Sequence, residues 1–118
     1  MSGKRSRDKG ARGERVTAEF LREVYPNARR GVGQTHSGTN SADVEGTPFW
    51  VEVKFGKQPN IRAAMAQAKN ACDERRCLVI SKRDRENMMV TMEIDTFLTI
   101  IDGYEKWLRH VSQGGKVD

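Results

Sequence analysis

The chain has 118 residues, a length that suits one domain and leaves no room for a second hydrophobic core. Hydrophobic residues make up 36% and charged residues 31%, which allows a compact core under a charged surface and excludes a largely apolar membrane protein. The formal charge of +5 and a pI near 9.5 favour an anionic partner, and nucleic acid is the leading candidate.

Neither a membrane segment nor a disulfide is expected. No apolar run approaches the ~20 residues of a spanning helix, and the N-terminus lacks the apolar segment of a signal peptide. We therefore expect a soluble, cytoplasmic protein with no membrane partner. Cys72 and Cys77 lie outside C-x-x-C spacing and are expected to be reduced, buried thiols.

The first part of the chain is strongly basic. Residues 1–8 mix Lys and Arg with Gly and Ser, and we expect a flexible basic arm, although it could also be only a solubilising tail. From about Lys9 to Tyr25 apolar residues recur at helical spacing, and Pro26 stops the pattern, so a first helix is predicted there. A possible short strand over 28–34 then leads into a loop rich in Gly, Ser, Thr and Asn.

Residues 49–55 are predicted to form a strand. Apolar side chains alternate there with Trp50, Glu52 and Lys54, so that one face is expected in the core and the other to carry chemistry.

A short strand ahead of it is expected to complete a hairpin. The apolar faces coincide only if Val44 lies opposite Val51, and this register places Asp43 opposite Glu52 with Cβ atoms about 4.5–5.5 Å apart. Two carboxylates that close repel each other, and a hard divalent cation such as Mg²⁺ or Mn²⁺ would relieve the repulsion. Lys54, on the same face, could address whatever the metal binds.

The second half of the chain predicts a helix, two strands and a further helix. Asn60 is a plausible cap for a helix over 61–75, "CLVIS" and "NMMVTMEI" read as strands, and Asp95 is expected to cap the last helix. The predicted order is helix, three strands, helix, two strands, helix. This is an α/β fold with a mixed central sheet flanked by helices, in one domain over 9–112 followed by a disordered tail at 113–118.

These residues also predict a reaction. A cation held by few carboxylates keeps open positions, where it can polarise a phosphoryl oxygen and activate a water. Combined with the basic charge, this favours hydrolysis of a phosphodiester. Glu14, on the side of the first helix turned toward the sheet, could reach the same site, although it could also be an ordinary surface acid.

The chain resembles the PD-(D/E)xK nucleases, and among them the archaeal-type Holliday junction resolvases. The resemblance rests on "GERVTAEFL", on "RRG" ahead of a Gly/Ser loop, and on "ADV", "VEVK" and "CLVISK", although Ala42 stands where the signature has Pro. It implies a restriction-endonuclease-like core. It also implies Asp43, Glu52 and the Val53 carbonyl as metal ligands, Glu14 as a further catalytic acid that supports this metal or a second ion, and Lys54 as the catalytic lysine.

Basic residues around this site are expected to hold DNA phosphates without reading sequence. The resemblance implies this role for Arg15, Arg30 and Lys82. A lone loop histidine such as His36, before Asp43, is more often a hydrogen-bonding or DNA-contact residue than a metal ligand, and its role stays open. The full set of candidate DNA contacts is Arg5, Arg7, Lys9, Arg12, Arg15, Arg29, Arg30, Ser37, Lys57 and Lys82.

The resulting hypothesis is a Mg²⁺-dependent endonuclease that acts as a homodimer and resolves four-way DNA junctions by paired cuts. Two alternatives stay open: a nuclease of the same fold that acts on linear, flapped or modified DNA, and a non-catalytic basic DNA-binding protein with a structural metal. Glu52 and Lys54 could also be an ordinary ion pair on a solvated strand. Whether Lys54 acts as a general base or stabilises charge on the phosphate is open as well.

Overall fold

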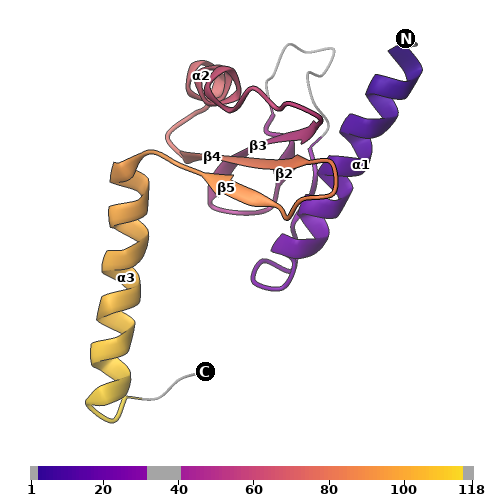
Figure 1. The fold of residues 1–118 in the computed structure, drawn as a ribbon. Coiled ribbons are helices and arrows are strands. Elements are labelled where there is room, and N and C mark those ends of the chain that lie inside the picture. The colour runs from indigo at the N-terminus through magenta and orange to yellow at the C-terminus, as the bar shows by residue number, and fades with distance from the viewer. Residues whose placement is uncertain (1–2, 32–40, 116–118) are drawn as a thin grey trace.

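The computed structural model describes residues 3–31 and 41–115, with the backbone alone for Gly3 and residues 5–7 (Figure 1). Its order of elements confirms the predicted fold class. The elements are α1 (Gly3–Leu21), β1 (Arg29–Arg30), β2 (Val44–Glu45), β3 (Phe49–Gly56), α2 (Ile61–Ala71), β4 (Arg76–Arg83), β5 (Met89–Thr91) and α3 (Ile94–Ser112).

The strands form one mixed sheet in the order β1-β2-β3-β4-β5. β3 and β4 run parallel over their whole length, with α2 as the crossover between them, and the other neighbours are antiparallel. Val44 lies opposite Val51, which confirms the predicted hairpin register. Gly46, in the hairpin turn, has a φ of +89° and lies so close to the Asn27 carbonyl that a Cβ would not fit.

Helices cover both faces of the central strand β3. On one face Val51 and Val53 pack with Ala18 of α1, and on the other Trp50 packs with Ala68 of α2. Figure 1 shows these two helices on opposite sides of the sheet. The expectation that one face of β3 would be core and the other free for chemistry is therefore wrong in part, because Trp50 is fully enclosed under α2 and only the later residues of that face reach a cavity.

The helix ends differ from the predicted ones. α1 begins at Gly3 and ends at Leu21, so residues 3–8, expected as a flexible arm, lie in its first turns. Lys and Arg have favourable helix propensity, and a prediction based on the spacing of apolar residues does not take this into account. At the other end, the Arg22 guanidinium donates to the Ala28 carbonyl (2.8 Å) and stabilises a turn in place of the last predicted helical residues.

The sequence predicted a capping residue for each of the other two helices. The Asn60 side chain accepts the Ala63 N–H (3.0 Å), which confirms the predicted cap of α2. α2 ends at Ala71 rather than near Arg75, because Asp73 accepts from the backbone N–H and guanidinium of Arg75 and closes a turn. The N-cap residue of α3 is Glu93 rather than Asp95. Asp95 lies in the first turn, where its negative charge interacts favourably with the helix dipole.

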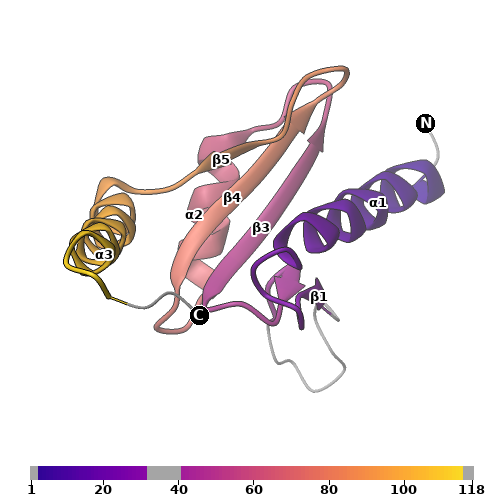
Figure 2. The ribbon, with the colours of Figure 1, turned by 90° about the horizontal axis from the view of Figure 1, so that it is seen from below.

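α3 stands apart from the rest of the fold. Figures 1 and 2 show it projecting from the end of β5, away from the sheet and from α1 and α2. The radius of gyration is 16.1 Å, against about 13 Å for a compact chain of about 100 residues. Within the described ranges, no helix is both long enough and apolar enough to span a membrane.

Candidate active site

Asp43 is fixed against β3 at the point where β2 begins. Its backbone N–H donates to the Val51 carbonyl (2.9 Å), and its carboxylate accepts the Val53 N–H (2.8 Å). The Asp43 carboxylate therefore accepts the hydrogen bond from β3 that a backbone carbonyl of a longer β2 would otherwise accept. N–H and C=O of one residue in an antiparallel ladder point to the same side, so the Val53 carbonyl faces this edge as well.

Glu52 is a buried carboxylate with unusual protonation behaviour. It is 5% exposed, and its Oε1 accepts the Trp50 indole N–H (3.1 Å). Burial, the charge of Asp43 and a hydrogen bond to Asp43 raise the pKa of Glu52 to about 7, while the bond from Trp50 and the charge of Lys54 lower it less. The site therefore disfavours two ionised carboxylates at once, and Glu52 holds its proton to a higher pH than an ordinary glutamate.

The two carboxylates open into a cavity of about 340 Å³ between α1, β3 and α2. The expected catalytic and metal-binding residues are brought together there. Glu14 comes from α1, Asp43 lies directly before β2, and Glu52, Val53 and Lys54 belong to β3. The lining residues are Lys9, Gly10, Glu14, Asp43, Glu52, Val53, Lys54, Phe55 and Gln67.

Glu14 reaches this cavity from α1 and is held by Arg30 of β1. The Arg30 Nε donates to Glu14 Oε1 (3.1 Å). Burial raises the pKa of Glu14 above its usual value and the Asp43 charge adds to this, whereas the bond and charge of Arg30 oppose it. Arg30 thus orients an acid at the site in addition to presenting a positive charge.

The donor set of the site fits a hard divalent cation. In the described part of the chain no group of three or more Asp, Glu, His or Cys side chains is arranged to hold a metal, so Glu14 is not grouped with Asp43 and Glu52 as a third ligand. Two carboxylates and the Val53 carbonyl remain. An all-oxygen set with few protein ligands suits Mg²⁺, which keeps several of its waters, and a cation would favour the ionised form of Glu52 that burial and the Asp43 charge disfavour.

Some basic candidates lie at the cavity and others do not. Lys9 lines it, with its ammonium also paired to Asp84 (3.2 Å). Lys82 lies opposite Phe55 across the parallel strands, so its side chain shares the α1 face rather than the face of Glu52 and Lys54. Lys82 lines a separate groove beside α1, as does Arg12.

The other basic candidates are more scattered. Arg15, Arg29 and Lys57 are exposed, and the Arg29 guanidinium donates to the Asn27 carbonyl (3.2 Å). The backbones of Arg5 and Arg7 belong to α1. Ser37 and His36 lie outside the described residues.

Gln67 is a site residue that the sequence did not indicate. It lies on α2 next to the buried Ala68 and lines the cavity with Glu52 and Lys54. One feature of the sequence could have indicated it. Gln67 borders the face of α2 that Ala64 and Ala68 bury, and a polar residue at such a border lies at the edge of the surface on which the helix packs. Both cysteines are free thiols; Cys77 is buried as predicted, whereas Cys72 is only half-buried.

Comparison of the chain with models of protein families, with curated proteins and with solved structures finds no match. Inference about its function therefore rests on the geometry of the site itself. That geometry is a carboxylate pair, with Glu52 buried and Asp43 half-buried, together with a lysine, a third acid and an amide around an open cavity, in a basic chain.

Proposed function

We propose that this chain is a Mg²⁺-dependent DNA endonuclease that acts as a homodimer and resolves four-way junctions. One observation carries the proposal: the carboxylates of Asp43 and Glu52 lie side by side, next to Lys54, in a cavity open to solvent. An ordinary ion pair on a solvated strand does not account for this arrangement, because Glu52 is buried and bonded to Trp50.

The chain's own residues have distinct roles in this proposal. Asp43, Glu52 and the Val53 carbonyl would hold Mg²⁺, for which Mn²⁺ could substitute. When bound, the ion would polarise a phosphoryl oxygen and lower the pKa of a bound water. The Lys54 ammonium, on the same face of β3, would hold the phosphate and stabilise the charge that develops on it.

Residues on the helices would complete the binding of the substrate. Glu14, oriented by Arg30, would accept a hydrogen bond from a water in the cavity. Gln67 would donate from the α2 side. Lys9 and the exposed Arg15 of α1 would bind neighbouring phosphates, in keeping with a basic protein that meets DNA in the cytoplasm.

The homodimer follows from the reaction. Resolving a four-way junction needs two cuts on opposite strands, and the described part of the chain contains one such carboxylate pair with a lysine. Two chains related by a two-fold axis would supply two sites.

The test is a cleavage assay on a four-way junction and on a duplex of the same sequence, with Mg²⁺ and with a chelator. We expect cleavage of the junction with Mg²⁺ only, and none from the Asp43→Asn and Glu52→Gln variants. Both should bind DNA as well as or better than the wild type, because each removes a charge that repels phosphate. Glu74→Gln, at an exposed acid outside the cavity, is the matched control and should cleave normally.

Three outcomes would contradict parts of the proposal. Normal cleavage by Glu52→Gln would reject the site. Equal cleavage of duplex and junction would leave a nuclease of other DNA substrates. Tight binding without cleavage by the wild type would leave a DNA-binding protein.

A further inference from the structure

α3 presents an apolar stripe that no other element of the described chain covers. Its large apolar residues are mostly exposed, with exposed fractions between 38% and 66%. Figures 1 and 2 show the helix away from the body, so no element formed by residues 3–31 and 41–93 covers this face. The residues of the stripe are Ile94, Phe97, Ile101, Tyr104, Leu108 and Val111.

The spacing within the stripe indicates what kind of surface would cover it. The six positions alternate by three and four residues over the whole of α3, which is the a/d repeat of a coiled coil. Such a repeat fits the seam of another helix of the same length. Leu98, Ile100 and Trp107, which flank the seam, are exposed too and widen the contact.

The charges on α3 favour a second α3 in the opposite direction. Asp95 lies in its first turn, while Arg109 lies in its last turn. Antiparallel packing of two copies opposes the two helix dipoles and places the acidic first turn of each helix at the same end as the basic last turn of the other, with Asp95 and Arg109 themselves on the side away from the seam. Parallel packing would bring like charges together. In the middle, Asp102 and Lys106 pair within the helix (2.9 Å) and do not distinguish the two directions.

We infer that a second copy of this chain covers the stripe, with the two α3 helices packed antiparallel about a two-fold axis near the middle of the helix. Ile101 then packs against the partner's Tyr104, and Phe97 packs against the partner's Leu108. All six residues of the stripe then contact the partner within the length of α3. Both copies contribute the same surface, as a two-fold interface requires.

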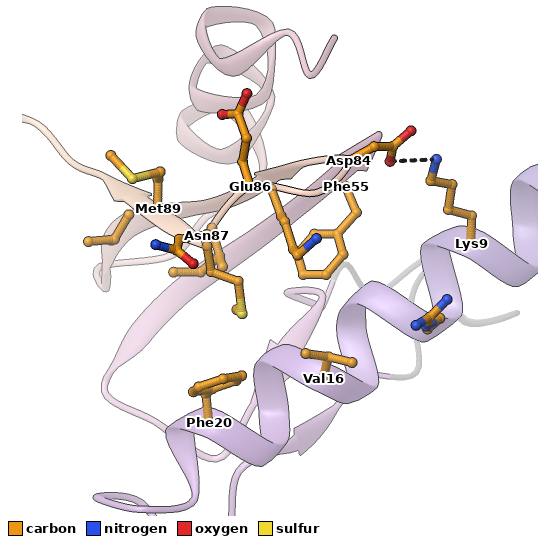
Figure 3. A pocket seen from close by; sticks show the side chains of 13 residues that line it. Lys9, Val16, Phe20, Phe55, Asp84, Glu86, Asn87 and Met89 are labelled. Atoms are coloured by element: carbon orange, nitrogen blue, oxygen red, sulfur yellow. Dashed lines mark hydrogen bonds and ion pairs between the residues drawn. The ribbon is translucent and has the colours of Figure 1, made fainter. Parts of the chain in front are cut away.

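The main rival position for α3 is the groove between α1 and strands β4 and β5 of the second copy. This groove has a volume of about 670 Å³. Figure 3 shows Val16 and Phe20 of α1 on one side of it and Phe55 on the other. Its rim is charged, with the Lys9–Asp84 ion pair at one end. A two-fold pair of α3 helices covers the whole stripe with a copy of the same apolar surface, whereas the groove has a charged rim, so we place the contact between the two helices.

This inference supplies an interface for the homodimer of the proposed function. It rests on the proposed function only because that function calls for two chains. Its test needs no DNA. A dimer without nuclease activity would reject the nuclease alone, and an active dimer that survives Tyr104→Asp and Leu108→Asp would reject the interface alone.

The first experiment measures the mass of the full chain by light scattering at micromolar concentration. We expect the mass of two chains for the wild type and of one chain for Tyr104→Asp and for Leu108→Asp. Thr99→Asp introduces the same side chain on the outward face of α3 and should stay dimeric. Phe20→Asp, at an exposed position of the groove, should stay dimeric as well. Circular dichroism of each variant checks that the helices remain.

The second experiment tests direction by cross-linking, in a background with Cys72→Ala and Cys77→Ala. Chains with Phe97→Cys mixed with chains with Leu108→Cys should form a disulfide-linked dimer with oxidised glutathione, whereas Phe97→Cys alone should not. A monomeric wild type, dissociation by Phe20→Asp, or self-linking of Phe97→Cys would each overturn the antiparallel α3 pair.

Discussion

At the scale of single residues, Glu52 links the stability of the fold to pH. Burial and the neighbouring Asp43 charge raise its pKa from 4.5 to about 7, because both disfavour the ionised carboxylate. In the unfolded chain the group ionises near its ordinary pKa, so the folded state holds the proton more tightly. The stabilisation from this proton is complete below the unfolded pKa and is lost as the pH rises to about 7.

We predict that Glu52→Gln flattens this pH dependence. In the wild type without divalent metal, this group should lower the free energy of unfolding by on the order of 3 kcal/mol between pH 4.5 and 8. The glutamine keeps an oxygen for the Trp50 N–H but does not ionise, so the variant should be the more stable protein at pH 8. Urea unfolding in a chelator over this pH range measures the effect. Glu74→Gln should leave the slope unchanged, and an unchanged slope in Glu52→Gln would contradict the assignment.

The core of the site could be predicted from the sequence because one strand fixes it. Alternation along β3 places Glu52 and Lys54 on one face, and matching the apolar faces sets Asp43 beside them. The position of Gln67 depends on how α2 lies over the sheet, which no local pattern determines. The face of Lys82 depends on the register between β3 and β4, and a long crossover leaves that register open.

At the scale of elements, two helical glycines differ in what surrounds them. A Cβ on Gly13 of α1 would lie 3.0 Å from the Phe55 ring, whereas one on Gly103 of α3 would meet nothing within 4 Å. The glycine in α1 therefore allows the helix to approach β3 closely, next to Glu14. The glycine in α3 only weakens its helix.

We predict opposite consequences for alanine at these two positions. Gly103→Ala should raise the free energy of unfolding by about 0.5–1 kcal/mol, because alanine restricts the unfolded chain and favours the helix. Gly13→Ala gains the same propensity but displaces Phe55, so it should be less stable than Gly103→Ala and should reduce any activity that depends on Glu14. Urea unfolding of both variants measures the difference, and equal stabilisation would contradict the close packing of α1.

Among the elements, hydrophobic spacing predicted which segments are helices and strands more reliably than where they end. The Asn60 cap was readable because one side chain makes the bond that starts α2. The end of α2 at Ala71 depends on the turn that Asp73 makes with Arg75, and the N-terminal extension of α1 has no apolar repeat at all. The projection of α3 from the body was not predictable, because its amphipathic pattern fits a helix packed on the sheet equally well.

At the scale of the whole molecule, the proposed nuclease needs two cavities that act on one substrate. We predict that a dimer of one wild-type and one Glu52→Gln chain nicks one strand of a four-way junction without resolving it, because only one cavity can cut. Differently tagged chains, copurified and assayed on a junction with each strand labelled in turn, measure this. Mixed dimers with Glu74→Gln are the control and should resolve the junction. Complete resolution by the Glu52→Gln mixture would contradict one active site per chain.

The hydrogen bond from Trp50 to Glu52 gives the site an optical signal of its own. The chain has two tryptophans, and Trp107 lies on α3, so that a Trp107→Phe variant would emit from Trp50 alone. Trp50 is enclosed between α2 and the sheet, and the Arg75 guanidinium lies 5.0 Å from the centre of its ring. Any proton or cation that changes the charge on Glu52 therefore changes the field at the indole, and the intrinsic fluorescence of the protein can follow occupancy of the carboxylate pair without an added dye.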